Sequence, residues 1–390
     1  MKKAIILLMS VQFLVYLGFG IVIPVLPEAV VAQGYDEMHV GGLLTVYALA
    51  SFFTAPLWGS YSDRTGRKKL IMIGLAGFSL SFFLFALFTH SLPMMYLSRI
   101  IGGLFSGALY TAVTGFVADL TDEENRNKYM GFLGMSIGLG FIFGPAFGGI
   151  LGDYSLSLPF TASGTLILLL LFYAAVVLKE PVRQGEAKKR AIIPEGAARL
   201  WGYRVRYLFL LSFMVTFLLA GIEATFQLFN IHKIDITPKQ IGYLFMFSGL
   251  VDAAIQGGVV RRVKNGMETN IIILAQMITA AGLILMLFTG SLFWAGLSLC
   301  VFTAGNALAR TILVSLTTKE SGGRYGTAAG MSYSMDNIGR IGGPLLFSWL
   351  FTRLPDGVYG ISAALAVVSI VLLLLYRRSD RTLRNAEPLR

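Results

Sequence analysis

The sequence predicts an all-α polytopic membrane protein with twelve transmembrane helices in two related six-helix bundles. Three observations predict this class: long apolar runs, a one-sided distribution of basic residues, and a glycine pattern that recurs in both halves. Hydrophobic residues make up 55% of the 390 residues, and only 14% are charged. The mean hydropathy is +0.71. A water-soluble domain rarely has this composition, because its surface must be solvated.

The apolar runs approach or reach the roughly 20 residues that a helix needs to cross about 30 Å of hydrocarbon. Helix is favoured over a β-barrel because it satisfies backbone hydrogen bonds within one continuous segment. The first run is too long for the core of a signal peptide and lacks a cleavage site, so we expect it to be retained. The expected spans are 4–27, 40–61, 70–89, 93–118, 129–152, 158–178, 206–230, 240–260, 268–289, 291–315, 325–351 and 356–376.

The basic residues predict the orientation of these spans. If the N-terminus is inside, 26 of the 32 Lys and Arg residues lie in cytoplasmic tails and loops, and only Lys233, Lys239 and Arg353 lie outside. Cytoplasmic loops of membrane proteins carry this excess. We therefore expect a multi-pass protein of the plasma membrane with both termini in the cytoplasm. The net charge of +11 then reflects topology rather than nucleic-acid binding.

The longest polar stretch divides the chain into halves. We expect an N-terminal bundle over 1–178, a cytoplasmic linker over 179–205 and a C-terminal bundle over 206–390. The fifth span of each half carries the same glycine and proline spacing, which indicates an internal repeat. The matching residues are Gly131, Gly140, Gly144 and Pro145 in the first half, and Gly330, Gly339, Gly343 and Pro344 in the second.

The loop between the second and third spans resembles the signature cytoplasmic loop of the major facilitator superfamily. It reads Gly-Ser-Tyr-Ser-Asp-Arg-Thr-Gly-Arg-Lys-Lys, with Gly59, Asp63, Arg64, Gly66 and Arg67 at the characteristic places. The two glycines permit a tight turn, and the aspartate can accept hydrogen bonds from a helix N-terminus. The resemblance implies the major facilitator fold and a loop that takes part in conformational change.

Three further motifs are similar to those of the drug/proton antiporter group of this superfamily. The fifth span carries an antiporter-type motif that continues through Gly148, in which small residues allow close helix packing and Pro145 introduces a bend. The first span matches through Leu-Gly-Phe-Gly-Ile-Val-Ile-Pro, and the fourth through Arg99 and Gly103. The resemblance covers nearly the whole chain and is nearest to NorA-type and Bmr-type multidrug efflux pumps.

The second half carries charges inside its spans. The resemblance implies that Glu223 couples transport to protons, because burial disfavours its charged form and allows proton exchange. A structural ion pair is the alternative. Asp336 and Arg340 are four residues apart, so we expect them to neutralise each other on one helix face. Asp252 has no partner of that local kind. Either aspartate could replace the family's second acid.

That second acid is expected in span ten, where this chain has Asn306. Counting span ten's Arg310, the second half holds three carboxylates and two arginines, an excess of one negative charge. One proton or one cationic substrate would balance it, and competition between them would couple their movements. The resemblance implies a central pocket in which aromatic rings bind lipophilic cations. Its expected residues are Tyr16, Phe19, Phe141, Phe226, Phe302, Asn306, Arg310 and Arg340.

We therefore expect a secondary transporter that exports lipophilic cationic drugs in exchange for protons by alternating access, acting as a monomer. The alternative is a proton-coupled transporter of a polar metabolite such as a sugar, with Gln12, Asn306, Asp336 and Arg340 lining a polar cavity. We expect no enzymatic activity, cofactor or metal, because no metal-binding His pattern occurs. A channel would not require the repeat with matched Gly and Pro.

Overall fold

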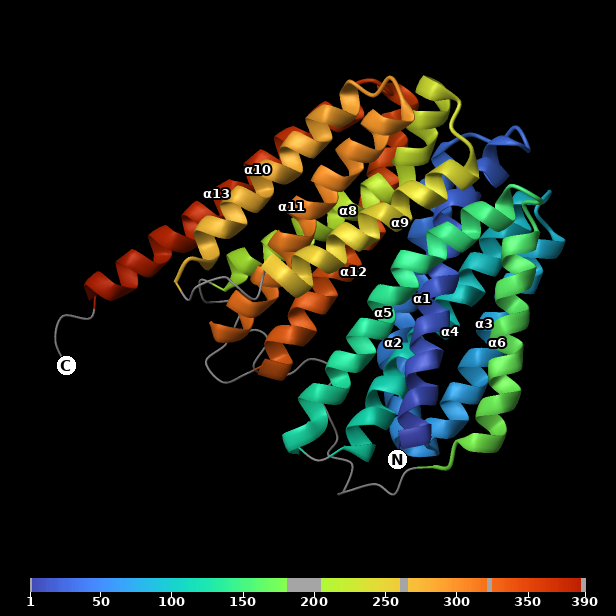
Figure 1. Cartoon of the computed structure of the whole chain (residues 1–390). Helices are drawn as coiled ribbons and strands as arrows, with labels where there is room; N and C mark the ends of the chain where they lie inside the picture. Colours follow the sequence, from blue (N-terminus) through green and yellow to red (C-terminus); the bar gives the residue numbers. More distant parts are fainter. Residues whose placement is uncertain (1, 122, 181–204, 260–265, 321–324, 387–390) are drawn as a thin grey trace. The chain divides into compact units, whose positions relative to one another are not determined.

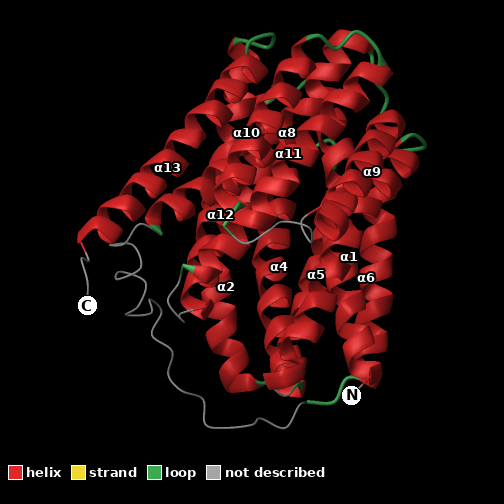
Figure 2. Ribbon diagram, turned by 60° about the vertical axis from the view of Figure 1, so that its left-hand side comes forward, coloured by secondary structure: helices red, strands yellow, loops and turns green. Residues whose placement is uncertain are grey.

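The computed structural model describes residues 2–121, 123–180, 205–259, 266–320 and 325–386. These residues form twelve α-helices and one five-residue π-helical turn, and they contain no strand (Figures 1 and 2). The helices are α1 (Lys2–Val31), α2 (Met38–Thr65), α3 (Arg67–Leu87), α4 (Leu92–Leu120), α5 (Glu123–Gly152), α6 (Leu158–Val177), α8 (Arg206–Ile234), α9 (Pro238–Ala254), α10 (Glu268–Leu287), α11 (Leu292–Lys319), α12 (Tyr325–Arg353) and α13 (Val358–Ala386), with the π-helical turn η1 (Ile255–Val259) after α9. The all-helical class is confirmed.

Ten of the described helices are long and apolar enough to cross a membrane. The remaining two, α9 and α12, occupy the places of the expected spans 240–260 and 325–351. α9 has 17 residues before the chain continues as η1. α12 carries Asp336 and Arg340 in its interior, and these charges lower its hydropathy. The two helices that depart from a purely apolar span are therefore in the second half.

The chain folds into two compact units. Unit 1 contains α1 to α6 together with Ile236–Met246, and unit 2 contains α8, the chain from Phe247 and the helices to α13. Most of the expected linker, residues 181–204, lies outside the described residues. In unit 1, α1 packs along α5, α4 packs between α2 and α3, and α6 packs on α3.

Unit 2 repeats this pattern of neighbours. α8 packs along α12 as α1 does along α5, α10 packs on α11 as α3 does on α4, and α13 packs on α10 as α6 does on α3. Figure 1 shows α10 and α13 running alongside each other. The glycine pattern in the sequence therefore corresponds to a repeat in which five helices of each unit keep the same neighbours, while α11 contacts η1 where α4 contacts α2.

The matched glycines explain how the paired helices approach. A Cβ added at Gly140 would lie 2.8 Å from the backbone of α1, and one added at Gly339 would lie 2.9 Å from the backbone of α8. Gly144 and Gly343 face the same two backbones one turn later. Small residues allow helices to pack this closely.

The repeat departs from symmetry at one reciprocal pair. In unit 1, Gly148 of α5 lies against the backbone of Ile21, with an added Cβ 2.8 Å from the Ile21 Cα. In unit 2 the sizes are reversed: Gly221 of α8 takes the place of Ile21, and Phe347 of α12 takes the place of Gly148. The ring of Phe347 fills the space over Gly221. Phe347 is fully buried there. The loss of the glycine at position 347 is thus compensated on the partner helix.

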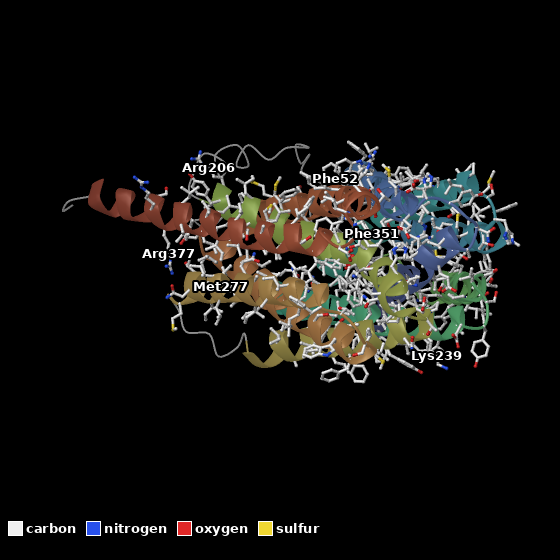
Figure 3. The ribbon with its side chains drawn as sticks, turned by 90° about the horizontal axis from the view of Figure 1, so that it is seen from above. Phe52, Arg206, Lys239, Met277, Phe351 and Arg377 are labelled. Carbon is white, nitrogen blue, oxygen red and sulfur yellow. The ribbon has the colours of Figure 1, made fainter. Side chains whose placement is uncertain are left out.

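The two ends of unit 2 are both held by ion pairs. At one end Lys319 Nζ lies 2.5 Å from Glu268 Oε1, and at the other Lys233 Nζ lies 2.6 Å from Asp356 Oδ1. Figure 3 shows Arg206 at the start of α8 and Arg377 near the end of α13 toward the same end of the unit. Between these ends, the helices hold the charged residues described next.

Candidate functional site

Glu223 forms an ion pair inside unit 2. It lies in the middle of α8, and Arg340 comes from α12, which packs along α8 through the glycine contacts described above. Arg340 Nη1 lies 3.4 Å from Glu223 Oε2, and the two side chains are 25% and 10% exposed. This geometry is the ion pair that the sequence left open as the alternative for Glu223.

Asp252 forms a second ion pair. Its Oδ2 lies 3.3 Å from Nη2 of Arg310 on α11. The amide of Gln256, one turn along the helix, donates to both carboxylate oxygens at 2.9 Å. Asp252 has no charged partner one turn away in the sequence, and its partner in the structure, Arg310, is 58 residues away.

Asp336 is held in a different way. Its Oδ1 accepts hydrogen bonds from the hydroxyls of Ser212, at 2.7 Å, and Thr216, at 2.9 Å. Both donors lie on α8 one turn apart, facing the same point on α12. Arg340 acts on Asp336 electrostatically, but the ion pair that its guanidinium makes at 3.4 Å is with Glu223. Arg340 was expected to neutralise Asp336, but in the structure it acts on both Asp336 and Glu223, and its ion pair is with Glu223.

The three acids and two arginines form one electrostatic group. Arg310 and Arg340 both lie within range to act on Glu223 and on Asp336. Among the described residues, two acids thus have a guanidinium at hydrogen-bonding or ion-pair distance, and the third has two neutral hydroxyls. When all five side chains are ionised, the group carries one uncompensated negative charge.

The expected aromatic pocket residues separate into two sets. In unit 1, the Tyr16 and Phe141 ring centroids lie 5.2 Å apart, those of Phe19 and Phe141 lie 5.6 Å apart, and Tyr47 extends the cluster at 5.5 Å from Phe19. Tyr16, Phe19 and Phe141 are partly exposed. Ring pairs at these distances attract one another beyond their burial. This cluster presents aromatic surface.

The unit 2 members of the expected pocket are buried. Phe226 and Phe302 have no exposed surface, and the backbone of Phe302 packs against Gly282 of α10. Asn306 is 3% exposed and donates its amide to the Val215 carbonyl oxygen at 2.9 Å. In this structure these three side chains pack the interior of the unit, and none presents a free face to a ligand.

Arg99 is enclosed by aromatic rings within unit 1. It is 2% exposed, and its guanidinium carbon lies 5.7 Å from the ring centroid of Tyr47, 5.9 Å from that of Phe82 and 5.3 Å from that of Phe85. Cation–π attraction of this kind is strongest where the cation is desolvated. It therefore offsets part of the cost of the intramembrane arginine that the sequence predicted.

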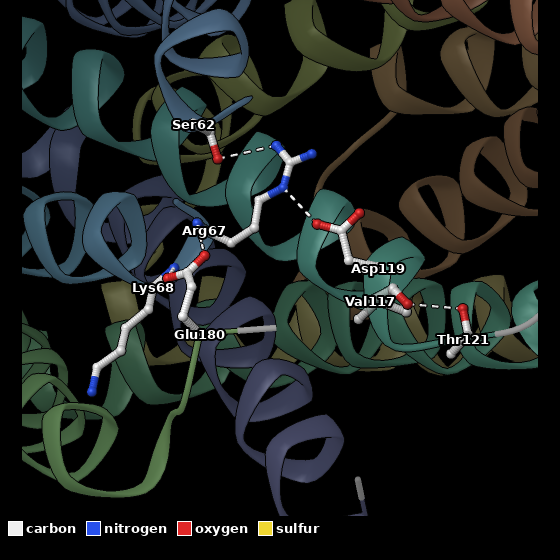
Figure 4. Close-up of polar contacts among 7 residues, drawn as sticks. All are labelled: Ser62, Arg67, Lys68, Val117, Asp119, Thr121 and Glu180. Carbon is white, nitrogen blue, oxygen red and sulfur yellow. Dashed lines mark hydrogen bonds and ion pairs between the residues drawn. The ribbon is translucent and has the colours of Figure 1, made fainter. Parts of the chain in front are cut away.

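The signature loop forms a turn between α2 and α3 that is fastened to two other helices (Figure 4). Gly66 has φ 108°, a conformation that favours glycine. Arg67 Nε donates to Asp119 Oδ2 at 3.0 Å, and Arg67 Nη1 donates to the Ser62 hydroxyl at 3.1 Å. The surroundings of Gly59 and the side chains of Asp63 and Arg64 lie outside what the structure describes.

The acceptor at the N-terminus of α3 is Glu180, which follows α6. Its carboxylate accepts from the backbone N–H of Arg67 at 2.5 Å and of Lys68 at 3.0 Å (Figure 4). The Lys68 ammonium donates to the Ala175 carbonyl oxygen at 2.9 Å. The similar acceptor role expected for Asp63 stays a prediction, because its side chain lies outside the part of the chain that the structure describes. A carboxylate at this place also interacts favourably with the helix dipole.

Sequence reasoning missed Ser212, Thr216, Asp119 and Glu180. The spacing of Ser212 and Thr216 was a usable signal, since hydroxyls four residues apart share a helix face. Recognising it required knowing that α8 faces the Asp336 turn of α12. Glu180 is 113 residues from the loop that it caps, and no local pattern marks it.

Comparison with known proteins identifies the family. The Major Facilitator Superfamily model matches residues 8–344. Multidrug resistance protein 2 of Bacillus subtilis is 32% identical over 90% of this chain and 89% of its own length. The quinolone resistance protein NorA of Staphylococcus aureus is 29% identical over 96% of this chain and 97% of its own.

Solved structures agree on the fold. The nucleoside transporter NupG superposes with a TM-score of 0.79 at 16% identity, over 96% of this chain and 99% of that one. A bacterial homolog of the human lysosomal transporter Spinster gives 0.76 at 14% identity, over 98% and 97%. With the repeated six-helix units, the signature loop and this family match, the chain is a membrane transporter, not an enzyme, and it belongs to the major facilitator superfamily.

Proposed function

We propose that this chain exports lipophilic, cationic drugs from the cytoplasm in exchange for protons, by alternating access. The observation that carries the proposal is the uncompensated charge in unit 2, where Glu223, Asp252 and Asp336 face Arg310 and Arg340. One bound cation or one bound proton neutralises the excess. If both bound at once, the group would carry a net positive charge, so the cation and the proton compete for the site. This competition couples their movements in opposite directions.

Two further observations support drug export. The relatives named above are a multidrug resistance protein and a quinolone resistance protein, and they match over most of their length. The partly exposed cluster of Tyr16, Phe19 and Phe141 offers flat aromatic surface, which suits lipophilic cations of varied shape better than a fixed set of hydrogen bonds. We place the protein in the plasma membrane with both termini in the cytoplasm.

The test is ethidium efflux from cells that express the chain, with and without a protonophore. Efflux that stops when the proton gradient collapses supports the exchange mechanism. A Gly138→Ala variant, in which the added methyl group meets no atom within 4 Å, controls for expression and handling. Efflux that continues unchanged after the gradient collapses contradicts proton coupling. Absence of efflux from well-expressed protein favours a polar substrate instead.

The polar-metabolite alternative has one structural observation in its favour. Gln12 is 1% exposed, and both atoms of its amide are buried without a hydrogen-bond partner among the described residues. Buried amides are normally satisfied, so this one is suited to a polar ligand or an ordered water. Uptake assays with labelled sugars on the same cells test this reading directly.

A further inference from the structure

Resting on the proposed proton exchange, we infer that Asp336 carries the exchanged proton, and that Glu223 and Asp252 stay ionised in their arginine pairs throughout transport. The first step of the argument is the nature of the partners. Glu223 and Asp252 each lie within 3.4 Å of a guanidinium nitrogen, whereas Asp336 Oδ1 accepts from two hydroxyls. Protonating Asp252 would remove the acid that pairs with Arg310, and protonating Glu223 would replace the 3.4 Å ion pair of Arg340 by its longer-range attraction to Asp336, and each loss is costly in a membrane interior.

Protonating Asp336 leaves both pairs intact. The hydroxyls of Ser212 and Thr216 are neutral and can turn, so each can donate to a carboxylate or accept from a carboxylic acid. The same two side chains therefore serve both protonation states without leaving a buried group unsatisfied. An arginine has five donors and no acceptor, so it cannot serve the neutral acid in this way.

Asp336 is also not fully enclosed by the protein. Its side chain is partly exposed rather than buried. Two cations act on it electrostatically, Arg340 on its own helix and Arg310 on α11. The other Asp, Glu, His, Lys and Arg side chains of α8, α11 and α12 are Glu223 in the middle of α8 and, near helix ends, Arg206, His232 and Lys233 of α8, Lys319 of α11 and Arg353 of α12. α13, the other neighbour of α12, has no Asp, Glu, His, Lys or Arg over 358–376. The charges that act on Asp336 are therefore those of the two arginines of the acid–arginine pairs.

The exchange then balances in charge. When a drug cation binds, the O–H bond of Asp336 breaks, the proton passes to water and the carboxylate keeps the electron pair. One positive charge enters and one leaves, so the net charge of the group is unchanged. In the reverse half of the cycle, protonation of Asp336 removes the negative charge that holds the cation.

The experiment measures protons released per ethidium bound by the purified, full-length protein in weakly buffered detergent solution across a range of pH. We expect about one proton per ethidium bound for the wild type. Asp336→Asn should bind ethidium more weakly, because it mimics the protonated acid, and the ethidium that it does bind at high concentration should release almost no proton. Release by Asp336→Asn at the wild-type level overturns the inference while leaving proton exchange intact. A wild type that releases no proton at any pH overturns the exchange proposal itself, and this inference with it.

The matched control must keep the charge excess. Glu223→Gln alone would free Arg340 to pair with Asp336 one turn away, and would abolish release whichever acid carries the proton. The double variant Glu223→Gln/Arg340→Gln removes one acid and one arginine together, so it should still release about one proton per ethidium bound. Loss of release by this double variant, with binding retained, assigns the proton to Glu223 and overturns the inference.

A second measurement decides the matter if Asp336→Asn does not bind ethidium. Ser212→Ala/Thr216→Val keeps the acid but removes both donors, which stabilise the carboxylate most strongly. The pH midpoint of ethidium binding should move up by about one unit or more. Ser362→Ala is the control, because its hydroxyl donates to the Val358 carbonyl oxygen of its own helix, and its midpoint should stay unchanged. Equal midpoints for the two variants overturn the inference.

Discussion

The close approach of α1 and α5 predicts that Gly144→Ala destabilises the protein. A Cβ at position 144 would lie 2.6 Å from the Leu17 carbonyl oxygen and 2.8 Å from the Gly20 Cα. Since both obstacles are backbone atoms, no side-chain rotation relieves the clash. Restoring ordinary contact at 3.4 Å requires the two helices to separate by about 0.8 Å. Overpacking of this kind costs about 1–3 kcal/mol of stability.

Thermal unfolding of the purified protein in detergent measures this loss. For a unit of this size, each 1 kcal/mol corresponds to roughly 2–4 °C, so Gly144→Ala should lower Tm by several degrees. Gly138→Ala lies on the same helix and adds the same methyl group where it meets nothing within 4 Å, so its Tm should not fall. Equal Tm values for the two variants would refute the packing argument.

Three other predictions use the same assay. Glu180→Ala should lower Tm more than Glu180→Gln, because the amide keeps an acceptor for the α3 N-terminus and loses only the charge; equal effects would argue against capping. Phe347→Gly should leave a void that Phe347→Gly/Gly221→Ile partly refills, and no recovery in the double variant would contradict the reciprocal packing. Arg340→Gln should lower Tm, with a loss of stability smaller than the roughly 3–5 kcal/mol of a fully buried pair, because Arg340 is 25% exposed, and adding Glu223→Gln should restore part of that loss. A further fall in that double variant would mean that the pair contributes little.

The fold could be predicted almost entirely from the sequence, since its signals are local. The lengths of the apolar runs predicted the spans, and the shared spacing of Gly140 and Gly144 with Gly339 and Gly343 predicted the repeat. In the structure the first two glycines lie against the backbone of α1 and the other two against that of α8. The span expected over 325–351 is confirmed as the helix α12. α12 carries charges and is not among the ten helices that are apolar enough to cross a membrane, yet it packs along α8 as the repeat requires.

The sequence shows which charged residues the site contains but not which of them pair. The sequence contained Glu223, Asp252 and Asp336 and the two arginines, but which acid meets which guanidinium depends on helix rotation. A turn of about 100° per residue moves a side chain from one neighbour to another. Arg340 thus meets Glu223 across 117 residues, and Asp336 meets hydroxyls across 120 or more. The roles proposed for these residues remain predictions.

In unit 1 a large residue on α1, Ile21, faces a glycine on α5, Gly148, whereas in unit 2 a glycine on α8, Gly221, faces a large residue on α12, Phe347. This inversion of size bears on how the two halves evolved. If both descend from one duplicated six-helix ancestor, the size of this contact was inverted in one copy, and neither single change is neutral. A bulky residue facing Ile21 would force the helices apart, whereas a glycine facing Gly221 would open a void. The ancestor's descendants must therefore have crossed a less stable intermediate or changed both positions together. Since that event the helices have been inherited as fixed couples, and α12 could not be exchanged for a copy of α5 without α8 being exchanged for a copy of α1.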